Sequence, residues 1–261
     1  MPGSERTSYE RLGQLDRSFL LLETDCAHMH VAALQIFDPG NLVRADGSLD
    51  ADHLCAYIHS RLHLIPRYRQ RIVITPLEGH PVWIDDATFN IRYHVRHAAL
   101  PRPGNEQQLK SLVGRLVSQQ LDRSKPLWEM WVIEGLADGR FAILSKTHHC
   151  MIDGISGVDL MNVIMDVEPR TAEIDPTPWQ PRPELSALEL LTGAVWQRLS
   201  LPAEILSAFG RRRGELVERT TALLRTLAAS FQSATTTPIN GAIGPYRRFT
   251  YVSMEIDEVK R

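Results

Sequence analysis

The stretch FAILSKTHHCMIDG, residues 141–154, joins an apolar run to two adjacent histidines, an aspartate and a glycine. The apolar residues predict a buried strand, so that His148 and His149 lie where the strand ends and a side chain can project into a cleft. A neutral imidazole accepts a proton from a hydroxyl near neutral pH, since the unperturbed pKa of histidine is about 6.5. The stretch therefore predicts a general base, with His149 as the first candidate and His148 as the second.

The two residues that close this stretch are expected to shape the loop. Asp153, four residues after His149, can hold the loop by a salt bridge or by hydrogen bonds. Gly154 leaves room for backbone or substrate to come close. A histidine pair with this spacing also occurs in ordinary structural loops, so the flanking sequence has to decide whether the site is catalytic.

A second apolar run precedes the first. Residues 128–134 predict a strand that pairs with residues 141–147, and the connection contains Asp138-Gly139, a dipeptide typical of hairpin turns. Residues 155–165 have a helix-like pattern. The histidines are thus expected between the second strand of a hairpin and a helix.

The rest of the chain up to residue 120 mixes strands with helices. Leucine and isoleucine at helical spacing predict helices over 49–64, which Pro66 ends, and over 105–120, with Asn105 as the N-cap. Short apolar or alternating runs predict further strands at 29–37, 71–75, 81–84 and 91–95. This mixture predicts an α+β fold with α/β layering.

Changes in composition divide the chain into four expected parts. They are residues 1–166 with the histidine stretch, a proline-rich linker at 167–184, a leucine-striped helical segment at 185–234, and a linker with a final strand (248–256) at 235–261. The helical segment contains three consecutive arginines at 211–213. A basic cluster beside apolar stripes is typical of a helix on an anionic membrane surface, but the same stripes also suit a helical hairpin packed on the protein's own core.

Composition excludes several classes of protein. With 261 residues and 43% hydrophobic content the chain can bury a sizeable core, and a net charge of −2 gives no reason to expect nucleic acid. The first eleven residues lack a signal-peptide core, and no stretch reaches the ~18 apolar residues of a membrane span. Any membrane contact is therefore expected to be peripheral, from a cytoplasmic location.

The cysteines and the remaining histidines predict neither a metal nor a disulfide. Cys26, Cys55 and Cys150 are widely spaced and suit a reducing compartment, with Cys150 read as a small buried residue. The pairs His28/His30 and His94/His97 have no carboxylate or cysteine pattern that completes a metal site. Glycine-rich nucleotide motifs are also missing from the sequence, so no cofactor is expected.

Several segments around the histidines share a resemblance. The motifs are PLWEMWVIEGL at 126–136, DGISGVDL at 153–160, LDRSFLLLE at 15–23, MHV at 29–31 and GPYRRF at 244–249. Together with HHCMIDG they resemble the bacterial wax ester synthase/diacylglycerol acyltransferase family. That family is part of the CoA-dependent acyltransferases with an H-H-x-x-x-D-G motif. The resemblance covers nearly the whole chain.

The resemblance implies a function. A long-chain fatty acyl-CoA would donate its acyl group to diacylglycerol or to a long-chain alcohol, giving triacylglycerol or wax ester, with acyl-CoA as a substrate and no cofactor. His149 would be the general base, and Asp153 would be structural, held by an arginine. Arg17, Arg247 and Arg248 are the candidates for that arginine. The family's substrates imply a place at the inner face of the membrane or on lipid droplets.

The resemblance also implies a two-subdomain acyltransferase fold, of which this chain supplies the N-terminal subdomain and an appended helical segment. Family members continue for about as long again, with an N-D-V motif that has no counterpart here. We therefore expect activity to need a polypeptide that supplies the C-terminal half. Two alternatives stay open: a non-catalytic lipid-binding or scaffold fragment, and a carrier-dependent condensation-type acyltransferase. Residues 126–136 favour the lipid enzyme over the latter.

Overall fold

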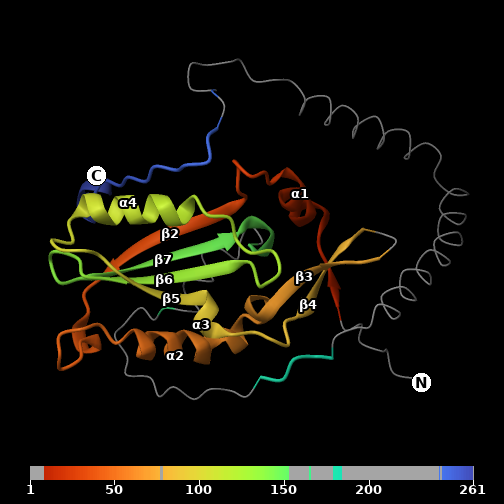
Figure 1. The fold of residues 1–261 in the computed structure, drawn as a ribbon, viewed down its shortest axis with the longest axis horizontal. Coiled ribbons are helices and arrows are strands. Elements are labelled where there is room, and N and C mark those ends of the chain that lie inside the picture. The colour runs from red at the N-terminus through yellow and green to blue at the C-terminus, as the bar shows by residue number, and fades with distance from the viewer. Residues whose placement is uncertain are drawn as a thin grey trace, which may run out of the picture. The chain divides into compact units, whose positions relative to one another are not determined.

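A four-stranded sheet carries the histidine stretch in the computed structural model of the chain (Figure 1), which describes residues 9–76, 79–152, 165, 179–183, 241 and 243–260. Its strands are β2 (His30–Phe37), β5 (Val95–Ala99), β6 (Trp128–Glu134) and β7 (Phe141–His148), in the order β2-β7-β6-β5. β7 is antiparallel to β2 and to β6, whereas β5 runs parallel to β6. The predicted hairpin of β6 and β7 is confirmed.

The two faces of this sheet are covered by different helices, α2 (Ala51–Arg61) and α4 (Glu106–Val117), which lie on either side of it in Figure 1. Side chains alternate between the faces along a strand. Met130 and Val132 of β6 therefore pack with Ile58 and Leu62, whereas Ile133 packs with the α4 side chains. Both predicted helices are confirmed, and Asn105 forms a capping box with Gln108.

A second, smaller sheet contains β1 (Glu10–Arg11), β3 (Gln70–Ile74) and β4 (Pro81–Asp85) in the order β1-β4-β3. The predicted strands at 71–75 and 81–84 are confirmed within a residue or two. Contacts divide the chain into one unit of residues 1–73, 81–184 and 244–261 and another of 74–80 and 185–243. Within the second unit, the backbone N–H of Thr75 donates to the carbonyl of His80 at 2.9 Å.

The C-terminal end of α4 is tied to the sheet by side chains of β2 and β7 and the residues before β2. The Lys146 ammonium donates to the carbonyls of Leu116 and Gln119, at 3.2 and 2.9 Å. The Nε2 atoms of His30 and His28 bond the next carbonyls in between, those of Val117 and Ser118, at 2.9 and 3.0 Å. The last carbonyls of a helix have no partner within the helix, and cations are favoured there. These bonds therefore fix α4 against the strands that lead to the histidines.

Two local elements differ from the expectations. Residues 91–95 are not a strand: Asn90 accepts a bond from the Arg92 N–H and caps α3 (Ile91–His94), and β5 begins only at Val95. The helix α1 (Gln14–Leu22) was not assigned from its pattern. The boundaries expected after residues 166, 184 and 234 fall largely outside the described residues and stay predictions.

The expected final strand at 248–256 is also absent. Among the described residues this segment has no strand partner, so its backbone cannot join a ladder. It lies instead along α4, where Phe249 packs on the helix side chains and the Lys110 ammonium donates to the Tyr251 carbonyl at 3.3 Å. The helical turn α8 (Ile256–Val259) follows. In Figure 1 this C-terminal trace runs beside α4.

Across the described ranges, no helix combines the length and the apolar character that crossing a bilayer requires.

Replacing Lys146 by methionine should destabilise the fold. The Lys146 side chain is 1% exposed and its ammonium lies 3.5 Å from the Glu129 carboxylate, so methionine removes one of the two cations beside that carboxylate, the other being Arg96. It also removes the donor to the carbonyls of Leu116 and Gln119. We expect Lys146→Met to lower the free energy of unfolding by about 3 kcal/mol, measured by chemical denaturation. Lys110→Met, which removes a more exposed cation from α4, is the control and should cost less. Equal losses in the two variants would contradict this account.

Candidate active site

The two adjacent histidines occupy different environments, because β7 ends at His148 and the turn η4 (His149–Met151) begins at the next residue. His148 is fully buried on the same face of β7 as Lys146, two residues before it. His149 is only partly buried. Of the two imidazoles, that of His149 is therefore the more exposed.

The His148 imidazole is neutral and held in one tautomer. Burial lowers its pKa to about 4. Its Nδ1 accepts the backbone N–H of Cys150 at 3.1 Å, so the single proton of the neutral ring lies on Nε2. Nε2 in turn faces the Glu23 carboxylate at 3.6 Å. His148 thus stabilises the turn η4 from inside the protein.

The His149 imidazole lies against α1. Its ring stacks on Phe19, with the ring centroids 3.9 Å apart and the planes at 23°. Its backbone N–H donates to the Met29 carbonyl at 2.8 Å. Its Nδ1 is buried and makes no hydrogen bond to the part of the chain described here. Phe19 therefore fixes the plane of the His149 ring, and Met29 fixes the backbone that carries it.

A buried carboxylate, that of Glu23, lies beside the His148 ring. The Glu23 side chain is 1% exposed and pairs with Arg123, whose Nη2 and Nε lie 2.6 and 3.0 Å from Oε2. Burial by itself raises the pKa of Glu23, but hydrogen bonds from Arg123, Gln120 and the Met29 N–H outweigh burial and leave the pKa below its ordinary value. Glu23 is therefore charged at neutral pH.

Sequence reasoning did not assign a role to Phe19 or Glu23. Both lie in LDRSFLLLE, residues 15–23, a stretch that supports the family resemblance but indicates no role for either side chain. Their spacing of four residues was the available signal, because it places two side chains on one side of a helix. Arg123, in the loop before β6, carried no comparable signal.

The remaining expected site residues are placed unevenly. Asp153 and Gly154 lie outside the described residues. Arg17 lies on α1, the helix that contacts η4. The Arg247 guanidinium donates to the carbonyls of Cys26 and Gly244, and its backbone N–H donates to Ser118. Arg248 is exposed.

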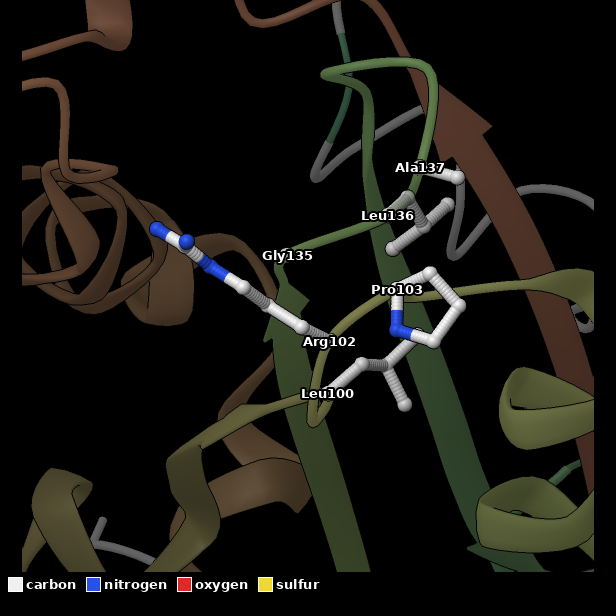
Figure 2. Close-up of a pocket in the computed structure, with 6 residues that line it drawn as sticks. All are labelled: Leu100, Arg102, Pro103, Gly135, Leu136 and Ala137. Carbon is white, nitrogen blue, oxygen red and sulfur yellow. The ribbon is translucent and has the colours of Figure 1, made fainter.

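A hollow of about 670 Å³ lies at the other end of the sheet (Figure 2). Its walls are Leu100, Arg102 and Pro103 after β5 and Gly135 to Ala137 after β6. The histidines lie at the C-terminal end of β7, whereas this hollow adjoins the turn that leads into β7. Gly104 and Gly135 pack so closely here that a Cβ on Gly104 would come within 1.9 Å of the Gly135 carbonyl oxygen. The hollow is separate from the histidine site.

Within the described ranges, no three histidine, cysteine, aspartate or glutamate side chains gather as metal ligands would.

The chain matches the sequence profile of the wax ester synthase/diacylglycerol acyltransferase catalytic domain over residues 12–261. It belongs to that family. The expected resemblance is confirmed, and with it the α+β acyltransferase fold. A solved structure, the wax ester synthase/diacylglycerol acyltransferase from Marinobacter aquaeolei VT8, is 33% identical and superposes with a TM-score of 0.51 over 59% of this chain and 37% of that one.

Named relatives in Mycobacterium tuberculosis differ in length. A probable diacylglycerol O-acyltransferase, tgs3, is 36% identical over 96% of this chain and 94% of its own length. A second protein named for the same activity is 32% identical over 97% of this chain but only 50% of its own length. The chain thus spans nearly all of one relative and about half of another in the same family.

The buried imidazole of His148 and the partly buried imidazole of His30 should make the fold sensitive to acid. Burial lowers the pKa values of His30 and His148 to about 4, whereas each titrates near 6.5 when unfolded. As pH falls from about 6.5 to about 4, the unfolded chain binds protons that the folded chain does not, so stability falls. At about pH 5.5 the buried His148 costs about 1.4 kcal/mol, and the partly exposed His30 costs less.

Melting temperatures between about pH 7.5 and about pH 5 test this expectation. His30→Gln keeps a side-chain donor for the Val117 carbonyl and removes one titrating group, so its melting temperature should fall less steeply with acid. His53→Gln, at an exposed position of α2, should keep the wild-type slope. An unchanged slope in His30→Gln would refute the assignment.

Proposed function

We propose that this domain transfers the acyl group of a long-chain acyl-CoA to the hydroxyl of diacylglycerol or of a long-chain alcohol, with His149 as the general base. Membership of the family supports the reaction class. The observation that carries the residue assignment is the contrast between the two histidines. His148 is fully buried and turned inward, whereas His149 is partly exposed on a turn fixed by Met29 and Phe19.

The proposed reaction needs one base and no covalent intermediate. His149 takes the proton of the acceptor hydroxyl, the oxygen attacks the thioester carbonyl carbon, and the C–S bond breaks. The imidazolium then protonates the CoA thiolate, so the base is restored. A positioned base of this kind contributes about 10²- to 10⁴-fold in rate. Cys150 is a poor nucleophile, because burial raises the pKa of its thiol to about 12.

The substrates and their route are further parts of the proposal. Residues 9–152 offer one wall for His149, and two bound substrates need a second wall that orients them and excludes water. A relative of which this chain covers only 50% carries more polypeptide than the matched region. We propose that a C-terminal part, in the same chain or in a separate one, completes the cleft. Water-insoluble acceptors would reach it from the inner membrane face or a lipid droplet.

His149→Ala should abolish acyl transfer without unfolding the domain. We expect CoA release from long-chain acyl-CoA with dioleoylglycerol or hexadecanol to fall by about 10²-fold or more, because the hydroxyl loses its proton acceptor. His53→Ala, which removes an exposed imidazole from α2, is the matched control and should keep wild-type turnover. Melting curves check that both variants fold. Turnover within about threefold of wild type in His149→Ala would rule out the general base.

Asp153 is proposed to hold the loop through Arg17, since α1 contacts η4 and the Arg247 guanidinium already binds two carbonyls. Asp153→Asn and Arg17→Gln should each lower the melting temperature and the activity, and combining them should add little to either loss. Fully additive losses would show that the two side chains act independently. Loss of all activity in Asp153→Asn at an unchanged melting temperature would instead give Asp153 a direct role in the reaction.

A further inference from the structure

The carboxylate of Glu23 contacts the surroundings of both histidines, although it lies 125 residues before His148 in the sequence. Glu23 follows the last residue of α1, and its side chain is buried. We propose that Glu23 is a positioning residue for acyl transfer, which holds the histidine turn through His148 on one side and Met29 on the other. This inference rests on the proposed function, in which His149 is the base.

The first route runs through the His148 ring. The Glu23 Oε2 atom lies 3.6 Å from Nε2, which is longer than a hydrogen bond, so the contact is electrostatic. A carboxylate at this place favours the tautomer with its proton on Nε2. That tautomer leaves Nδ1 free to accept the backbone N–H of Cys150, the central residue of η4. In the other tautomer, two N–H groups would face each other and the turn would lose this bond.

The second route runs through the backbone of Met29. The Glu23 Oε1 atom accepts the Met29 N–H at 3.2 Å, and the Met29 carbonyl accepts the His149 N–H at 2.8 Å. The same carboxylate therefore restrains the residue that bonds His149 directly. Its two oxygens act on two different neighbours of the base.

Substitution of Arg123 can distinguish a role of Glu23 in positioning the histidines from a role in stability. The Arg123 guanidinium compensates the Glu23 charge, but its side chain is 47% exposed and can be hydrated when the partner is lost. The guanidinium also donates to the Leu20 carbonyl at 2.9 Å, so it has a second anchor on α1. A variant that neutralises both Glu23 and Arg123 leaves neither charge without a partner, but it does not restore the contacts to His148.

The experiment compares Glu23→Gln, Arg123→Gln and the double variant in the assembly in which the wild-type chain turns over. Displacement of a base by a fraction of an ångström lowers kcat, so we expect Glu23→Gln to reduce kcat by about 10- to 100-fold and change the KM for acyl-CoA by less than about twofold. The double variant should melt at a higher temperature than Arg123→Gln, because it leaves no buried carboxylate unpaired, and it should keep the low kcat. Asp85→Asn is the matched control, because it neutralises another buried carboxylate paired with an arginine, on β4. It should lower the melting temperature without a selective loss of kcat.

Two results would overturn the inference. One is a wild-type kcat in Glu23→Gln. The other is recovery of kcat in the double variant, which would show that Glu23 only compensates the charge of Arg123. If Glu23→Gln fails to fold, Glu23→Asp replaces it, because aspartate keeps the charge and withdraws it from His148 by one methylene. An unchanged kcat in folded Glu23→Asp would also refute the role. Retained activity in His149→Ala would refute the proposed base itself, whereas a dead His149→Ala beside a fully active Glu23→Gln would refute only the role of Glu23.

Discussion

The carbonyl groups at the C-terminal end of α4 are the constraint on which the site depends. A helix end packed against a sheet must find donors for these groups, and Lys146, His30 and His28 supply them. The same bonds draw the start of β2 and the end of β7 together under the helix. Because Met29 lies between His28 and His30 and His148 lies two residues after Lys146, the helix end also sets where the histidine turn begins.

Strand geometry then separates the two histidines. Alternation along β7 turns His148 to the same face as Lys146, where it is buried. The strand ends there, so the next residue no longer follows the alternation, and His149 emerges on a turn that contacts α1. Adjacent residues of one type therefore become a neutral internal support and a partly exposed side chain. A one-residue shift in the register of β7 would have turned His148 outward and His149 inward.

Much of the fold could be predicted because its signals are local. The apolar runs of β6 and β7, the Asp-Gly turn between them and the Asn105 cap each act within a few residues, and all three were predicted correctly. The strand expected at 91–95 failed because the Asn90 cap outweighed an apolar pattern too short to distinguish strand from helix. Residues 248–256 failed because strand pairing needs a neighbour, which the segment itself does not encode. In the site, the histidines could be read from one stretch, whereas Glu23 and Arg123 meet only through tertiary packing.

The contact between Gly104 and Gly135 has a consequence for how this domain can diverge. With φ at +73° and +80°, both residues adopt a backbone that side chains disfavour, and the gap between them leaves no space for a Cβ on Gly104. Neither substitution can compensate for the other, since each adds atoms to the same crowded crossing. Orthologues that keep this close backbone approach should therefore retain glycine at both positions, even where the other residues that line the hollow differ. A lineage that has lost one of the two glycines should also have rebuilt the connections after β5 and β6.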